Sequence, residues 1–148
     1  RGVSLPAEIK IGSNLKNAVE GSEIIVLAVP SRFMRSICRK VRNVSYTKAM
    51  CLLNVAKGME VGSLNRMSQI IAEEMPGVPI AVLSGPSHAE EVARRLPTAV
   101  VTASSDLKLA RYIQNVFMNN RFRVYTSEDV IGVELCGALK NVIAIAVG

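Results

Sequence analysis

The sequence predicts an α/β protein with a partial doubly wound, Rossmann-like parallel sheet. Apolar segments of strand length alternate with segments in which apolar residues recur at helical spacing. The strand-length segments are almost continuously apolar, which is typical of strands that helices cover on both faces of the sheet. Strand–helix alternation of this kind favours parallel strands joined by helices that cross the sheet.

Five segments are expected to form strands. The first, residues 24–29, is an unbroken run of Ile, Val, Leu and Ala. The other four are residues 49–56, 80–84, 98–103 and 122–125. Because each is short and rich in apolar residues, these segments suit a buried sheet, and we expect the strands to run parallel.

Helices are expected between the strands, each begun by a side chain that suits an N-cap. Ser31, Ser63 and Asp106 are the expected caps of the three longer helices. Their inward residues are expected to be Met34, Ile37, Cys38 and Val41, then Leu64, Met67, Ile71 and Met75, then Leu109, Ile113, Val116 and Phe117. Two shorter helices are expected at residues 14–20, ended by Gly21, and at residues 88–95.

The last segment, residues 129–148, differs from the rest of the chain. It is long, compatible with a helix and unusually rich in Gly and Ala. We therefore expect residues 1–126 to form the sheet domain and residues 127–148 to begin a second, helical domain.

Composition excludes several functional classes. The net charge is +6, but the basic residues are spread out and are not interleaved with aromatic residues, which argues against nucleic-acid binding. The longest wholly apolar runs have six residues, so no membrane insertion is expected. Three cysteines without a CxxC spacing argue against a disulfide framework or a metal site and favour a reducing, cytoplasmic location.

Three strand ends carry polar, turn-forming residues. They are Pro30-Ser31, Lys57-Gly58 and the turn from Gly85 to Ser87. Parallel strands bring such ends to one edge of the sheet, where open α/β sheets bind their ligands. Ordinary loop chemistry explains the same residues equally well. The single histidine, His88, is a further acid–base candidate, but no carboxylate is placed to orient it.

Lys140 lies in an otherwise uncharged stretch from Cys136 to Ala144. A lysine there must either extend its ammonium to water or face a polar cleft. In the cleft it loses part of its solvation, which suits proton transfer. Gly137, one turn earlier, would leave room for a substrate on the same face.

Several motifs together resemble the NAD(P)-dependent glycerol-3-phosphate dehydrogenase family, in its bacterial form. They are Ala-Val-Pro-Ser at 28–31, Ala-Lys-Gly-Met-Glu at 56–60, Leu-Ser-Gly-Pro-Ser-His-Ala-Glu-Glu-Val-Ala at 83–93, Pro-Thr-Ala at 97–99 and Phe-Arg-Val-Tyr-Thr at 122–126. The strongest match is Asp-Val-Ile-Gly-Val-Glu-Leu-Cys-Gly-Ala-Leu-Lys-Asn-Val at 129–142. The resemblance covers essentially the whole chain, in order.

The resemblance implies an oxidoreductase that transfers a hydride between NAD or NADP and dihydroxyacetone phosphate, a small-molecule phosphate substrate. The product is sn-glycerol 3-phosphate for phospholipid synthesis. It implies that Lys140 is the catalytic proton donor and acceptor, and that Lys57 contacts both substrate and cofactor. The other implied substrate-binding residues are Gly85, Ser87 and Asn141, and the other implied cofactor-binding residues are Pro30, Ser31 and Ala89.

The sequence also departs from the family. It has no Gly-x-Gly-x-x-Gly loop, and it has no counterpart of the family's downstream Asp and Arg-Asn residues. We therefore expect residues 1–126 to be the C-terminal part of a dinucleotide-binding domain and the chain to be inactive alone. A sheet that lacks a central strand exposes an edge, so a homo-oligomer is expected. A hydroxyacid or phosphogluconate dehydrogenase of the same architecture, or a non-catalytic self-associating chain, are the alternatives.

Overall fold

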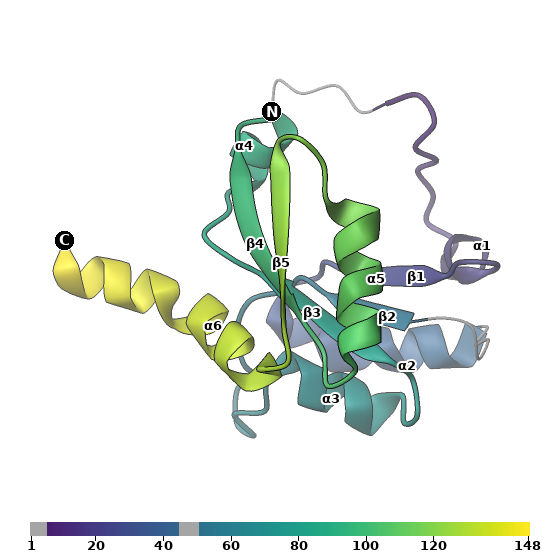
Figure 1. Cartoon of the computed structure of the whole chain (residues 1–148). Helices are drawn as coiled ribbons and strands as arrows, with labels where there is room; N and C mark the ends of the chain where they lie inside the picture. The colour runs from purple at the N-terminus through teal and green to yellow at the C-terminus, as the bar shows by residue number, and fades with distance from the viewer. Residues whose placement is uncertain (1–5, 45–50) are drawn as a thin grey trace.

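Five strands form one sheet in the order β1-β2-β3-β4-β5 (Figure 1). The structure, a computed structural model, describes residues 6–44 and 51–148. The strands are β1 (Ile24–Leu27), β2 (Cys51–Asn54), β3 (Ile80–Ser84), β4 (Thr98–Ala103) and β5 (Phe122–Ser127). All five predicted strands are therefore present, although the first residues of the second prediction, 49 and 50, lie outside the described residues.

The sheet is parallel except at one pairing. Strands β1, β2 and β3 run parallel, with Leu27 opposite Asn54 and Asn54 opposite Val82. Strand β4 runs antiparallel to β3, with Ser84 opposite Val101, and β5 is again parallel to β4. The predicted Rossmann-like α/β sheet is confirmed, but the expectation that all strands run parallel is wrong, because β4 and β5 run opposite to β1, β2 and β3.

The short helix between β3 and β4 explains this reversal. Helix α4 (Ala89–Ala93) has five residues, which rise only about 7 Å along the helix axis. A parallel crossover must return over the full length of a strand, about 17 Å for five residues. The chain therefore turns at the carboxyl end of β3 and enters β4 from that same edge.

The remaining helices follow the predicted order. They are α1 (Leu15–Val19), α2 (Met34–Val44), α3 (Met67–Glu74), α5 (Leu107–Phe117) and α6 (Val130–Val147), with a 3-10 turn at Ser31–Phe33 before α2. Asn14 caps α1, and the Asp106 carboxylate accepts a hydrogen bond from the Lys108 backbone N–H, 2.8 Å away, at the start of α5. The Asp106 prediction is confirmed.

Several helical details differ from the predictions. Ser31 makes no capping hydrogen bond, because a 3-10 turn precedes α2 and Pro30 takes the cap position. Helix α3 begins at Met67 rather than after Ser63, and Leu64 is exposed with φ +58°. Val116 is exposed as well, since the inward face of α5 is set by Ala110 and Ile113.

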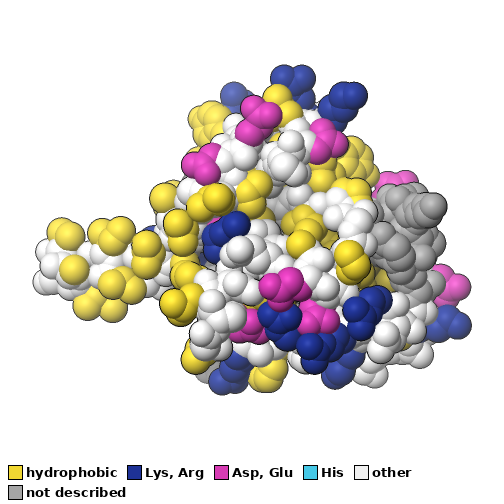
Figure 2. All heavy atoms as spheres, turned by 90° about the horizontal axis from the view of Figure 1, so that it is seen from below, with side chains coloured by type: hydrophobic (Ala, Val, Ile, Leu, Met, Phe, Trp, Pro, Cys, Tyr) yellow, Lys and Arg dark blue, Asp and Glu magenta, His cyan; other side chains and the backbone are white. Residues whose placement is uncertain are grey.

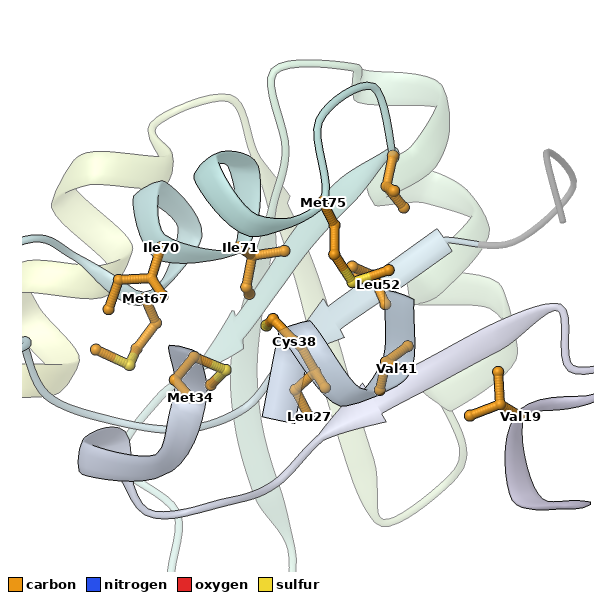
Figure 3. Close-up of a cluster of buried hydrophobic side chains, with 11 residues drawn as sticks. Val19, Leu27, Met34, Cys38, Val41, Leu52, Met67, Ile70, Ile71 and Met75 are labelled. Atoms are coloured by element: carbon orange, nitrogen blue, oxygen red, sulfur yellow. The ribbon is translucent and has the colours of Figure 1, made fainter. Parts of the chain in front are cut away.

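Helices cover both faces of the sheet, and β2 shows this most clearly. Leu52 belongs to a core cluster that α1, α2 and α3 build on one face (Figure 3). Cys51 and Leu53 point the other way and pack with Ala81 and with Ile113 of α5. All of these residues except Cys51 are fully buried, so burial on both faces explains the continuous apolar pattern of the strands.

Ion pairs join α2 to α3 on the outer surface of this layer. The Arg35 guanidinium donates to Glu60 and Glu74 at 2.8 Å, and Arg39 donates to Glu74 at 2.9 Å. These bonds hold the pKa of Glu74 near 2, well below its usual value. Basic and acidic side chains are seen together on this face in Figure 2.

Helix α6 leaves the body of the molecule, and its end projects from it (Figures 1 and 2). Its buried residues are Glu134 and Gly137, whereas Val142, Ile143 and Ile145 are exposed. Within the part of the chain that the structure describes, α6 alone is long and apolar enough to cross a membrane, judged by length and composition only. The absence of membrane insertion stays a prediction.

Candidate active site

Three loops meet at one edge of the sheet, because β1, β2 and β3 are parallel and end there together. The loop after β1 carries Pro30 and Ser31, and the loop after β2 carries Lys57 and Gly58. The turn after β3 contains Gly85, with Ser87 two residues later. The expectation that these strand ends come together is confirmed.

Lys57 links the second loop to the third. Its ammonium donates to the carbonyl oxygens of Gly85, at 3.2 Å, and Ser87, at 3.4 Å. Burial lowers the pKa of the Lys57 ammonium, and the nearby positive charge of Lys140 lowers it further. Two cations therefore stand close together at this edge, which suits an anionic ligand or a developing negative charge.

Asn54 and Glu60 fix the Lys57 loop at its two ends. Asn54, buried at the end of β2, exchanges hydrogen bonds with the backbone of Ala56, at 3.0 Å and 3.2 Å. Glu60 accepts both arms of the Arg35 guanidinium fork, each at 2.8 Å. The loop backbone is thus held on both sides of Lys57.

Gly58 lets this loop pass close to the end of β1. Its φ of +126° is a backbone conformation that favours glycine. A Cβ at this position would lie 3.2 Å from the Ser31 hydroxyl. Glycine is therefore required here by the backbone and by the contact between the two loops.

Lys140 reaches the same edge from α6. The helix begins with Asp129 as its cap, whose carboxylate accepts a hydrogen bond from Gly132 N–H at 2.8 Å. Two turns later Gly137 lies directly against Ser84, the last residue of β3, and a Cβ on Gly137 would overlap the Ser84 hydroxyl. The absence of a side chain at Gly137 thus lets α6 pack directly on the end of β3, and it also leaves room for the cavity beside it.

Two cavities flank Ser84. One, of about 470 Å³, is lined by Gly85, Gly137 and Lys140 among others. The second, of about 440 Å³, is lined by Lys57, Ser87 and Ala89. The buried Ser84 hydroxyl has no hydrogen-bond partner in the described part of the chain.

The other candidates do not line either of these cavities. Asn141 is exposed on α6 and lines neither cavity. Pro30 and Ser31 lie at the end of β1 beside Gly58, outside both linings. His88 is exposed and takes the N-cap position of α4 without a capping hydrogen bond from its side chain.

Three residues with clear structural roles at this site were not predicted from the sequence. Asn54, Glu60 and Glu134 are polar groups that hold the loop and the helix bearing the two lysines. The one signal for Asn54 is a polar residue inside an apolar strand segment. Glu60 and Glu134 contact residues 25 and 68 positions away, which no local pattern reveals.

Comparison with known proteins gives a consistent result. Residues 1–110 match the family model for the NAD-dependent glycerol-3-phosphate dehydrogenase N-terminus, and residues 129–148 match the model for its C-terminus.

Individual relatives agree with the family models. The chain is 48% identical to a glycerol-3-phosphate dehydrogenase [NAD(P)+] of Clostridium tetani over 99% of its length, and 49% identical to one of Fusobacterium nucleatum. It spans 42–44% of the length of these relatives. A solved glycerol-3-phosphate dehydrogenase from Coxiella burnetii superposes with a TM-score of 0.90 at 36% identity, over 98% of this chain and 44% of that one.

Proposed function

This chain belongs to the NAD-dependent glycerol-3-phosphate dehydrogenase family, and from that premise we propose that it supplies part of the active site for reduction of dihydroxyacetone phosphate to sn-glycerol 3-phosphate. The observation that carries the proposal is the meeting of Lys57 and Lys140 at the carboxyl edge of the parallel strands. A phosphorylated ketone is an anion that becomes more negative at its oxygen during reduction, which two cations favour.

Lys140 is the proposed proton donor. As hydride arrives at the carbonyl carbon, negative charge builds on the carbonyl oxygen. An ammonium in the cavity beside Gly85 and Gly137 stabilises that charge and delivers the proton to the oxygen. In the reverse direction the same amine accepts the proton of the alcohol.

Lys57 is proposed to orient the substrate and to contact the cofactor. Its ammonium has two backbone carbonyls as partners, Gly85 and Ser87, and it retains a third N–H for a ligand. Burial lowers the pKa of the Lys57 ammonium, and the nearby Lys140 lowers it further. An anion bound beside Lys57 would favour the charged form of its ammonium. Gly85, Ser87 and Asn141 are the proposed substrate contacts beside the two lysines.

Pro30, Ser31, Lys57 and Ala89 are proposed to hold NAD or NADP. The fit is supported by the second cavity, where Lys57 and the small residue Ala89 line the same space. The unpartnered Ser84 hydroxyl is consistent with a ligand close by. The bound cofactor supplies the hydride, and the chain supplies position and charge.

The wider assignments are proposals of the same kind. Residues 1–126 are the end of the dinucleotide-binding domain and residues 127–148 begin the helical substrate domain, as the two family matches and the Asp129 cap support. The protein is proposed to act in the cytoplasm, in phospholipid synthesis, as a homo-oligomer. The exposed apolar side chains at the end of α6 support burial against further protein.

A chimeric protein tests the function. In it, this chain replaces the matching 42% of the Clostridium tetani relative, and the unaltered relative is the control. We expect the chimera to oxidise NADH or NADPH when dihydroxyacetone phosphate is added, and to ignore unphosphorylated dihydroxyacetone. A folded chimera that leaves the reduced cofactor unconsumed, while the control consumes it, overturns the proposal.

A further inference from the structure

We propose that Glu134 is a positioning residue whose buried carboxylate, held at the start of α3, fixes α6 so that Lys140 lies beside Lys57. The proposal rests on the proposed function and extends it to a residue that lines neither cavity. Its evidence is a set of contacts that joins two elements far apart in the sequence.

Three donors surround the Glu134 carboxylate. Arg66 Nη1 donates to Oε2 at 2.6 Å, Ser68 N–H donates to Oε1 at 2.8 Å, and Ser68 Oγ donates to Oε2 at 2.6 Å. Arg66 also donates to the Ser68 hydroxyl at 2.9 Å, so the three groups form one network. The Glu134 side chain is only 6% exposed, and short charge-assisted bonds in such a place are strong and directional.

Few buried residues anchor this helix. Within α6, Glu134 and Gly137 are the buried residues, and the apolar side chains from Leu139 onward are exposed. Gly137 has no side chain, so its contact with Ser84 sets how close the helix approaches but leaves it free to roll. Glu134, the other buried residue of α6, is therefore the polar contact best placed to set the rotation of the helix.

Helical geometry shows how Glu134 sets the rotation of α6 about its own axis. At 3.6 residues per turn, Glu134 and Lys140 point about 60° to either side of Gly137. The carboxylate faces the start of α3, Gly137 faces β3, and Lys140 faces the cavity beside Gly85. Releasing the carboxylate lets the helix roll about its glycine contact, and the lysine ammonium moves away from Lys57.

A simple stabilising role is the alternative. Buried ion pairs recover little net free energy, because both charges lose water, so stability alone is a weak reason for this network. A positioning role differs in one respect that can be measured. Its effect on catalysis must pass through Lys140 and disappear when that lysine is absent.

The first experiment is a double-mutant cycle on kcat in the chimera. Glu134→Gln keeps the shape but turns an amide N–H₂ toward one of the three donors. We expect it to lower kcat about 10- to 100-fold, as a displacement of roughly 1 Å does, with a smaller change in KM. In the Lys140→Ala background the same substitution should leave kcat unchanged.

The control is Glu128→Gln. It removes an exposed carboxylate from the residue just before the α6 cap, and Glu128 makes no side-chain hydrogen bond in the described part of the chain. We expect kcat to stay at its starting value in both backgrounds. A loss from Glu134→Gln that is equal with and without Lys140 overturns the positioning role.

The second experiment needs no turnover. Because Lys140 helps to lower the pKa of Lys57, moving α6 should raise the Lys57 pKa toward its usual value. NMR titration of the Lys57 side chain should show this rise in Glu134→Gln and in Lys140→Ala, and no change in Glu128→Gln. An unchanged Lys57 titration in Glu134→Gln contradicts the proposal. If the starting chimera reduces no dihydroxyacetone phosphate, the proposed function fails, and this titration still decides the role of Glu134.

Discussion

Gly137 of α6 lies directly against the hydroxyl of Ser84 at the end of β3, so that a single added methyl group would overlap it. This contact packs the helix that carries Lys140 against the end of β3, next to the loop that carries Lys57. It also encloses a hydroxyl that has no hydrogen-bond partner there. The site geometry therefore depends on a position where only glycine fits.

Gly137→Ala should push α6 away from β3. Overpacking of this kind costs about 1–3 kcal/mol of unfolding free energy, and we expect kcat to fall as well because Lys140 moves with the helix. Urea unfolding and steady-state kinetics of the chimera measure the two effects.

The matched variant is Ser84→Ala, which removes the overlapping oxygen and leaves the Ser84 Cβ at an ordinary 3.5 Å from the added methyl group. Combined with Gly137→Ala, it should recover most of the lost stability. A double variant no more stable than Gly137→Ala alone would show that the Ser84 contact is not the cause.

Cys136 should be the one reactive thiol of the three. It is exposed and lines the cavity that holds Lys140, whereas Cys38 and Cys51 are buried. Burial raises the pKa of Cys38 to about 11 and raises that of Cys51, which keeps both in the unreactive thiol form. Brief treatment of the folded chain with iodoacetamide, followed by peptide mass spectrometry, should find the label on Cys136.

The labelled site gives a second readout. An adduct on Cys136 occupies the cavity, so the labelled chimera should turn over substrate more slowly, and Cys136→Ala should prevent the loss. Labelling of Cys38 before unfolding would contradict the described core.

The sequence predicted the elements better than their connections. β3 and β4 were predicted at the exact observed bounds, because continuous apolar runs mark strands buried on both faces. The reversed direction of β4 was missed, although the short helix expected at residues 88–95 leaves little length for a parallel crossover. Leu64 was expected to point inward from a helix, but a turn with positive φ precedes α3.

The candidate site was also predicted only in part, because local residue patterns reveal the two lysines but not their tertiary contacts. Lys57 and Lys140 stood out because each is a charge next to apolar or glycine-rich segments, and the structure places them at one edge. Asn54 and Glu134, which hold the loop and the helix that bear these lysines, were not assigned a role, since Glu134 lies six positions before Lys140 and on a different face of the helix. Their partners are set by tertiary packing, so a carboxylate on α6 looks like any surface charge until its contact with Arg66 is known.

Acid should weaken the junction of α2 and α3. The pKa of Glu74 is about 2 in the folded chain against an ordinary 4.5, because Arg39 and Arg35 donate to its carboxylate. A depressed pKa gives stability that is fully present above pH 4.5 and is lost as the pH falls through 2. Glu74→Gln should therefore be less stable at pH 7, with the difference vanishing near pH 2.

Melting temperatures of Glu74→Gln and of the starting protein, measured from pH 7 to pH 2, test this loss of stability. The control is Glu91→Gln, which removes an exposed carboxylate on α4 that takes no part in the α2–α3 ion pairs. A constant difference between Glu74→Gln and the starting protein from pH 7 to pH 2 would contradict the pairing.

Lys57→Ala should raise KM for dihydroxyacetone phosphate and also lower kcat. Its ammonium bridges the Gly85 and Ser87 carbonyls and would touch the bound substrate in both the ground state and the transition state. Lys108→Ala, an exposed lysine on α5, is the control for loss of positive charge. A change in kcat alone would assign Lys57 to the chemical step rather than to binding.

The most direct test of the central claim is the kcat of Lys140→Ala in the chimera, with circular dichroism to confirm folding. If Lys140 stabilises the developing charge on the carbonyl oxygen and delivers the proton, kcat should fall about 100- to 1000-fold, far more than substrate binding weakens. Lys140→Arg should restore little, since guanidinium is larger and does not readily release a proton. A folded Lys140→Ala variant with near-native kcat would contradict the account and make Lys140 only a surface residue of α6.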